Sequence, residues 1–136
     1  MACSWKKSGY WLNAGLAAAL LLNAVSAQSR RLNGPFMPET LGDVLDYLIS
    51  PDGAFVVYVA DQDTNDVYEL YRTPLDGSGA PVQLNSEMVE GGNVGELFNF
   101  YAEFLISPDG SRVVYRADQE LDERFELYSV PADGSS

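Results

Sequence analysis

Carboxylates and their neighbours are the residues that could do chemistry in this chain of 136 residues, because it contains no histidine and only one cysteine, Cys3. Without histidine there is no Ser-His-Asp or Cys-His nucleophilic site and no histidine-bound zinc. The Gly-x-Ser-x-Gly elbow of the α/β-hydrolases is also missing from the sequence. We therefore expect no catalytic residues and no enzymatic activity.

One acidic loop has the spacing of a metal site. In the run Asp61-Gln62-Asp63-Thr64-Asn65-Asp66, oxygen-bearing side chains alternate as in the first half of a calcium loop. The sequence makes Asp61, Asp63 and Asn65 candidate calcium ligands, and calcium is the one cofactor it suggests. A calcium loop usually has glycine at its sixth position and glutamate at its twelfth, where this chain has Asp66 and Arg72. The alternative is a structural loop, in which Asp61 and its counterpart Asp118 accept hydrogen bonds from nearby backbone amides.

We expect the remaining carboxylates to be solvent-exposed surface residues and not catalytic residues. Two acids suffice for glycoside hydrolysis when they flank a sugar, but no pair stands out among the 20 acidic residues. The formal net charge of −12 repels phosphate backbones, which makes nucleic acid a poor partner. Anionic membrane surfaces are disfavoured for the same reason.

Residues 1–27 have the three parts of a secretory signal peptide. Lys6 and Lys7 form a basic start, a short apolar stretch centred on residues 16–22 follows, and Ala24-Val25-Ser26-Ala27 offers a small-residue cleavage site. We expect a signal-peptide helix that is removed on export, and a periplasmic or secreted protein. The alternative is an uncleaved anchor, which would be the chain's only attachment to a membrane.

An internal repeat organises the rest of the chain. Residues 49–77 and 106–134 align without a gap at an offset of 57, and 17 of the 29 positions are identical. Gly42-Asp43-Val44 also matches Gly92-Asn93-Val94, so extra residues are inserted around 95–102. Repeats of this length indicate units that bury their faces against one another.

Each repeat predicts four short antiparallel strands. In the first unit we expect them at 44–49, 55–59, 68–73 and 81–84, separated by Pro-Asp-Gly and Asp-Gly turns. We also expect Gly53 and Gly110 to adopt positive φ in these turns. The run 55–59 is apolar on both faces, which is typical of a strand buried on both sides. This layout predicts an all-β fold of β-propeller blades.

The repeated Ser-Pro-Asp-Gly, Val-Val-Tyr, Glu-Leu-Tyr and Pro-x-Asp-Gly elements resemble the blade repeat of TolB-like propellers. The resemblance covers about residues 42–136. It implies a propeller fold and a binding role. A role in the Tol–Pal envelope system is not carried over, because the N-terminal domain of TolB does not fit between residues 28 and 41. Residues 42–91 would form a first blade, and residues 92–136 a second blade truncated before its fourth strand.

Residues 28–41 are expected to be a linker or a closing strand of a preceding blade, because Leu32-Asn33 resembles Leu84-Asn85. Stacked repeats need about three units for stability. We therefore expect a fragment of a larger propeller, or a chain that associates with itself or with a protein partner to complete one.

Two functions follow from this sequence. The first is a non-enzymatic exported module that binds protein or ligand. The aromatic residues Phe98, Phe100, Tyr101 and Phe104 would form either a contact surface for this binding or an extended strand. The alternative is the N-terminal propeller portion of a larger exported hydrolase, peptidase-like, whose catalytic domain lies outside this sequence.

Overall fold

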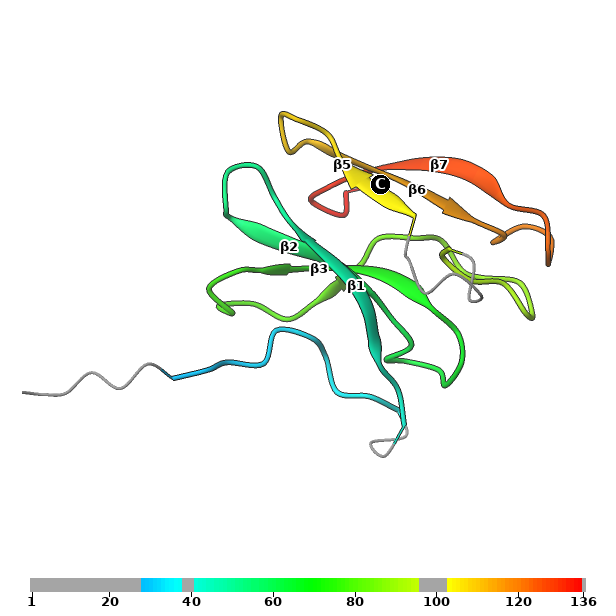
Figure 1. Cartoon of the computed structure of the whole chain (residues 1–136), viewed down its shortest axis with the longest axis horizontal. Helices are drawn as coiled ribbons and strands as arrows, with labels where there is room; N and C mark the ends of the chain where they lie inside the picture. The colour runs from blue at the N-terminus through cyan, green and yellow to red at the C-terminus, as the bar shows by residue number, and fades with distance from the viewer. Residues whose placement is uncertain (1–27, 38–40, 96–102, 136) are drawn as a thin grey trace, which may run out of the picture.

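The computed structural model describes residues 28–37, 41–95 and 103–135, and this part of the chain is all β. Two antiparallel sheets lie next to each other (Figure 1). The first sheet has the order β1-β2-β3-β4 and the second β5-β6-β7. The strands are β1 (Val44–Ile49), β2 (Phe55–Ala60), β3 (Glu69–Pro74), β4 (Val82–Gln83), β5 (Phe104–Ile106), β6 (Arg112–Ala117) and β7 (Glu126–Pro131). The described residues include no helix long and apolar enough to cross a membrane.

Strand β2 is the most buried element of the molecule. All six of its residues are buried, as the apolar run predicts, because β1 and β3 flank it and both of its faces are covered. Val57 and Val59 have no exposed surface. Burying a side chain of this size contributes about 1.5–3 kcal/mol to the free energy of unfolding.

The two Ser-Pro-Asp-Gly segments form the hairpin turns that the sequence predicts. Gly53 and Gly110 both adopt a φ of 72°, a conformation open to glycine at little cost. Ser50 closes the first turn: its Oγ accepts hydrogen bonds from the amides of Ala54 and Phe55 at 3.1 and 3.0 Å. Ser107 accepts the equivalent bond from the second unit, and each serine hydroxyl donates to the turn aspartate at 2.6 Å.

The repeat seen in the sequence is a repeat in the structure. Tyr58 pairs with Tyr71 across β2 and β3, and Tyr115 pairs with Tyr128 across β6 and β7. Both tyrosine pairs stack with ring centroids 5.4 Å apart. The match of Gly42-Asp43-Val44 to Gly92-Asn93-Val94 is also confirmed. Val44 pairs with Ala60, and Val94 makes an isolated bridge to the equivalent Ala117.

Each sheet has two faces, which we name by the side chains of its second strand. The valine face carries Val57 in the first sheet and Val114 in the second. The tyrosine face carries Tyr58 in the first sheet and Tyr115 in the second. Residue pairing across the strands keeps these faces continuous, because side chains alternate along a strand and paired residues share a face.

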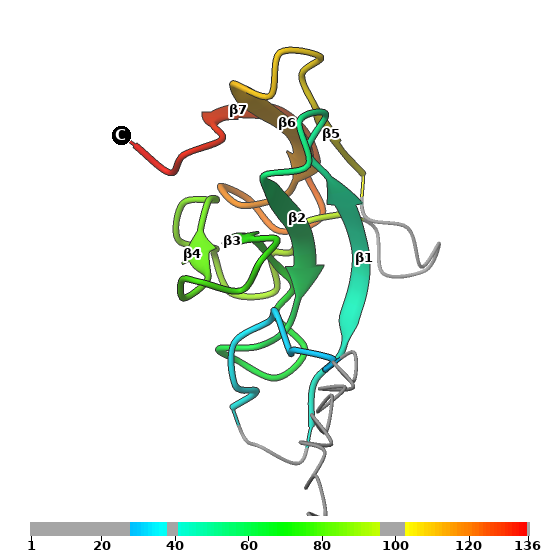
Figure 2. The same ribbon diagram turned by 90° about the vertical axis from the view of Figure 1, so that its left-hand side faces the viewer.

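The hydrophobic core forms where the valine face of the first sheet meets the tyrosine face of the second. Figure 2 shows the two sheets lying against each other. The first sheet and the segment after β4 contribute Phe55, Val57, Val59, Leu70 and Leu84, and the second contributes Phe104, Val113, Tyr115 and Ala117. The contact is head-to-tail, since different faces of the two repeats meet. The outward surfaces are therefore the tyrosine face of the first sheet and the valine face of the second.

Some expected boundaries shift, and Phe104 follows the strand alternative. The third strand lies one residue later than expected, and β4 is only two residues long. Phe104, expected in a contact surface or in a strand, begins β5 and is 5% exposed, because it faces the first sheet. Its aromatic neighbours in that expectation lie within 96–102, outside the described residues. So does the expected signal-peptide helix.

Candidate functional site

The three predicted calcium ligands have separate partners in the structure. The buried Asp61 carboxylate accepts the Asp43 amide at 2.6 Å through Oδ1 and the Asp66 amide at 3.2 Å through Oδ2. Asp63 accepts the Tyr71 hydroxyl at 3.1 Å, while Asn65 donates to Asp66 at 2.6 Å. The structure therefore gives Asp61 the backbone-bonding role that is the alternative to calcium.

The matching loop of the second unit repeats this arrangement. Asp118 accepts the Asn93 amide at 2.6 Å and the Glu123 amide at 2.9 Å. Asp66 and Glu123 both adopt positive φ, of 63° and 61°, at equivalent positions. No group of three acidic or thiol ligands suited to a metal occurs in residues 28–37, 41–95 and 103–135. Calcium binding stays a prediction.

The carboxyl groups with a lowered pKa belong to turns. Hydrogen bonds from the Ser107 hydroxyl and the Ser111 backbone lower the pKa of exposed Asp109 to about 2. The same kind of bond, from Ser50 first, lowers the pKa of Asp52. Serine donors that favour the ionised form stabilise a turn, and neither group sits in a cleft with a second acid.

The outward valine face of the second sheet is the strongest candidate for a functional site. Leu105, Val114 and Leu127 lie on it with 70%, 39% and 77% of their surfaces exposed. They line a shallow groove of about 370 Å³ that crosses β5, β6 and β7. These three large apolar side chains are grouped on one exposed face and are not scattered singly over the surface.

Cationic side chains frame this apolar groove. Arg116 pairs with Glu103 at 2.7 Å and its guanidinium lies 4.3 Å from the centre of the Phe125 ring. Arg112 donates to the hydroxyl and carbonyl oxygens of Ser129 at 2.8 and 3.0 Å. An apolar centre with a polar rim is the usual anatomy of a protein-binding surface.

In the first sheet, the equivalent residues are buried against a neighbouring sheet. Val114 and Leu127 correspond to Val57 and Leu70, which have no exposed surface because the second sheet covers them. None of these residues was predicted from the sequence. The offset of 57 was the signal that could have found them, since it aligns Leu127 with Leu70.

The outward tyrosine face of the first sheet is partly covered by residues 32–37. The amide of Gly34 donates to Gln62 Oε1 at 3.0 Å and to the Tyr58 hydroxyl at 3.4 Å. Phe36 packs against the buried cluster of Tyr58, Ala60 and Tyr71. Figure 2 shows this N-terminal segment running beside β2. A second hollow, of about 230 Å³, remains beside Tyr47, which is 63% exposed.

Comparison of the chain with protein-family models, with curated proteins and with solved structures found no match. The TolB-like resemblance therefore stays a prediction that depends on the repeat motifs. A function for this chain must therefore be inferred from its two outward sheet faces and from the contacts that the repeat units make with each other.

Proposed function

We propose that this chain is a non-enzymatic, exported β-propeller repeat module that binds protein through the valine face of its second sheet. One observation carries the proposal: Val114 and Leu127 are exposed, whereas their repeat counterparts in the first sheet, Val57 and Leu70, are buried against the second sheet. Binding there would remove apolar surface from water, which is the dominant favourable contribution to protein association.

The strand layout supports the propeller assignment. The first unit is a four-stranded antiparallel meander, and the two units stack face to face through apolar side chains. Propeller blades have this strand number and this mode of packing. Export is proposed from the pattern of residues 1–27 and from the high negative charge of the whole chain.

Site-specific photocrosslinking tests the proposal. A benzophenone amino acid replaces Leu127 in the full chain, produced in the cells that make the protein, and adducts are identified by mass spectrometry. The matched control carries the same group at Leu121, an exposed leucine (55%) in the loop between β6 and β7. We expect protein adducts at position 127 and few at 121. Equal labelling at both positions, or none at 127, contradicts the proposal.

A further inference from the structure

The N-terminal segment sits on the first sheet as the segment after β4 sits on the second. The Asn33 side-chain amide donates to the Gly34 carbonyl at 2.8 Å, and Asn85 donates to the Ser86 carbonyl at the same distance. Gly34 hydrogen-bonds Tyr58, as the Ser86 backbone hydrogen-bonds the equivalent Tyr115. Residues 32–34 therefore match residues 84–86 in their contacts as well as in sequence.

This match assigns a position to the two residues that come before. Val82 and Gln83 form β4 immediately ahead of Leu84, so their counterparts ahead of Leu32 are Arg30 and Arg31. Strand β4 pairs with β3, through Tyr71 with Gln83 and Arg72 with Val82. Arg30 and Arg31 thus stand where the fourth strand of a preceding sheet would end.

Strand β7 offers the edge on which such a strand would pair. It is an edge strand among the described residues of the second sheet. In the first sheet, Leu70 bonds through its amide to Asn85 at 2.7 Å and through its carbonyl to the Leu84 amide at 2.8 Å. Leu127 is the counterpart of Leu70, so its backbone groups face the open edge, where Leu32 and Asn33 of another molecule would fit.

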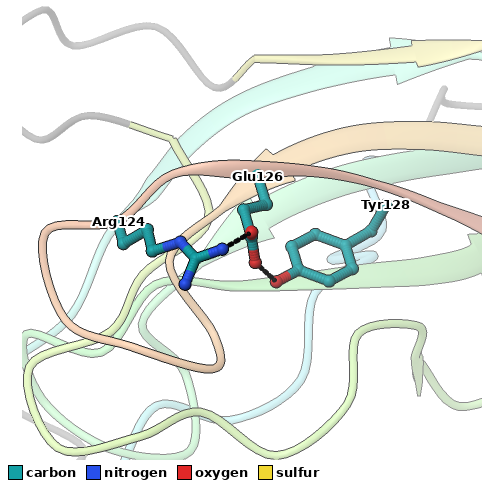
Figure 3. Close-up of polar contacts among 3 residues, drawn as sticks. All are labelled: Arg124, Glu126 and Tyr128. Carbon is teal, nitrogen blue, oxygen red and sulfur yellow. Dashed lines mark hydrogen bonds and ion pairs between the residues drawn. The ribbon is translucent and has the colours of Figure 1, made fainter.

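The charges on the N-terminal segment and on β7 are also complementary. In the first sheet, Gln83 on β4 donates to Glu69 on β3 at 2.6 Å. The counterpart of Glu69 is Glu126, which Figure 3 shows between Arg124, at 2.6 Å, and the Tyr128 hydroxyl, at 3.2 Å. The counterpart of Gln83 is Arg31, an exposed cation. An arginine at this position would give the carboxylate an ion pair, where glutamine gives it a hydrogen bond from a neutral amide donor.

From these correspondences we propose that a second copy of this chain docks head-to-tail on the second sheet. The tyrosine face of one copy, with Tyr47 and Val44, covers Leu105, Val114 and Leu127 of the next. Residues 30–33 of the first copy add to β7 as a fourth strand, and Arg31 meets Glu126. The interface repeats the contact that the two sheets already make within one chain. This inference rests on the proposed function, because it names the partner of the same face.

Contacts of this type connect different surfaces of identical subunits, so they either close into a ring or extend into a filament. Each copy brings two sheets. A propeller of about four to eight blades would then close with roughly two to four copies. Adding a strand across an open edge is a recurring mode of recognition, since backbone hydrogen bonds supply affinity and side chains supply register.

Disulfide trapping between two separate variants tests the strand pairing. Both carry C3S, and one carries R30C and the other S129C, because Arg72 pairs with Val82 at the equivalent position. The control mixture replaces S129C with S135C, an exposed site in the last turn. After mild oxidation we expect several-fold more R30C–S129C heterodimer than control heterodimer. Equal yields, or no heterodimer, would overturn the proposal.

A charge exchange gives a second, independent readout. Light scattering should show less association for R31E and for E126R, and restored association for R31E/E126R, because the double variant re-forms the pair at every interface. Far-UV circular dichroism confirms that each variant is folded. No recovery in the double variant contradicts the inference.

The photocrosslink at Leu127 separates the two proposals. An adduct of two copies of this chain supports both of them. An adduct with a different protein keeps the proposed function and overturns the self-association. The absence of any protein adduct overturns both.

Discussion

The hydroxyl of Tyr115 donates a hydrogen bond to Gln119 Oε1 across 2.9 Å, inside the contact between the two sheets. Both residues are buried, and Tyr58 makes the equivalent bond to Gln62 at 2.8 Å. Burial is the main reason that the pKa of each tyrosine rises to about 12. The bond lets a large ring enter the core while its polar end stays satisfied.

Replacing Tyr115 by phenylalanine should lower the free energy of unfolding by about 1–2 kcal/mol, because buried Gln119 loses its donor. The stacking of the ring on residue 128 is retained, so the loss reports the two hydrogen bonds of the hydroxyl, with Gln119 and with the Ser86 backbone. Urea denaturation measures it. Y47F is the control, since Tyr47 is 63% exposed, and it should leave stability nearly unchanged. A Y115F protein as stable as the parent would show that these bonds contribute nothing.

Alanine at Gly53 or Gly110 should destabilise the fold by about 1 kcal/mol, since a side chain disfavours positive φ. A Cβ at Gly53 would meet no atom within 4 Å, and one at Gly110 only Pro51 at 3.9 Å. The cost is therefore conformational and not steric. Chemical denaturation of G53A and G110A measures it, with S78A in an exposed turn as the control. Unchanged stability in both variants would contradict the turn geometry.

Much of this fold can be predicted from the sequence, because short patterns of turn residues and apolar residues recur in both repeat units. The bounds of β1 and the burial of β2 follow from β-branched and aromatic residues between Pro-Asp-Gly turns. The length of β4 could not be predicted, because a strand of two residues shows almost no alternation of apolar and polar residues. The sequence left Phe104 between a contact surface and a strand, since a strand of three residues hardly shows which face is covered.

The site was harder to predict than the fold. Leu127 lies in a Glu-Leu-Tyr run that is identical to that of buried Leu70, yet Leu127 is 77% exposed. Identical residues differ in burial because one sheet has a neighbour on its valine face and the other has none among the described residues. Only the assembled tertiary structure distinguishes these two situations.

The carboxyl group of Asp109 should titrate with a midpoint of about 2 when it is followed by NMR. Its pKa in the folded protein lies below the ordinary value of 3.8, so its contribution to stability is present above pH 3.8 and is lost as the pH falls through about 2. Ser107→Ala removes the first cause of the shift. The midpoint should then rise toward the ordinary value. An unchanged midpoint in S107A would refute the assignment.

Replacing Asp61 by alanine should lower the free energy of unfolding by about 3 kcal/mol, because two backbone amides lose a charged acceptor. The two carboxylate oxygens serve different amides, those of Asp43 and Asp66, so asparagine, with one acceptor oxygen, should lose less. The exposed Asp63 is the matched control, and D63A should lose much less than D61A.

The same series separates a structural loop from a calcium site. If Asp61 only fixes the loop, D61A loses the same stability with calcium as with a chelator, and D118A loses a similar amount of stability. Thermal denaturation of all four variants in both buffers measures this. A parent protein whose melting temperature rises with calcium, while that of D61A and D63A does not, would instead establish Asp61 and Asp63 as calcium ligands.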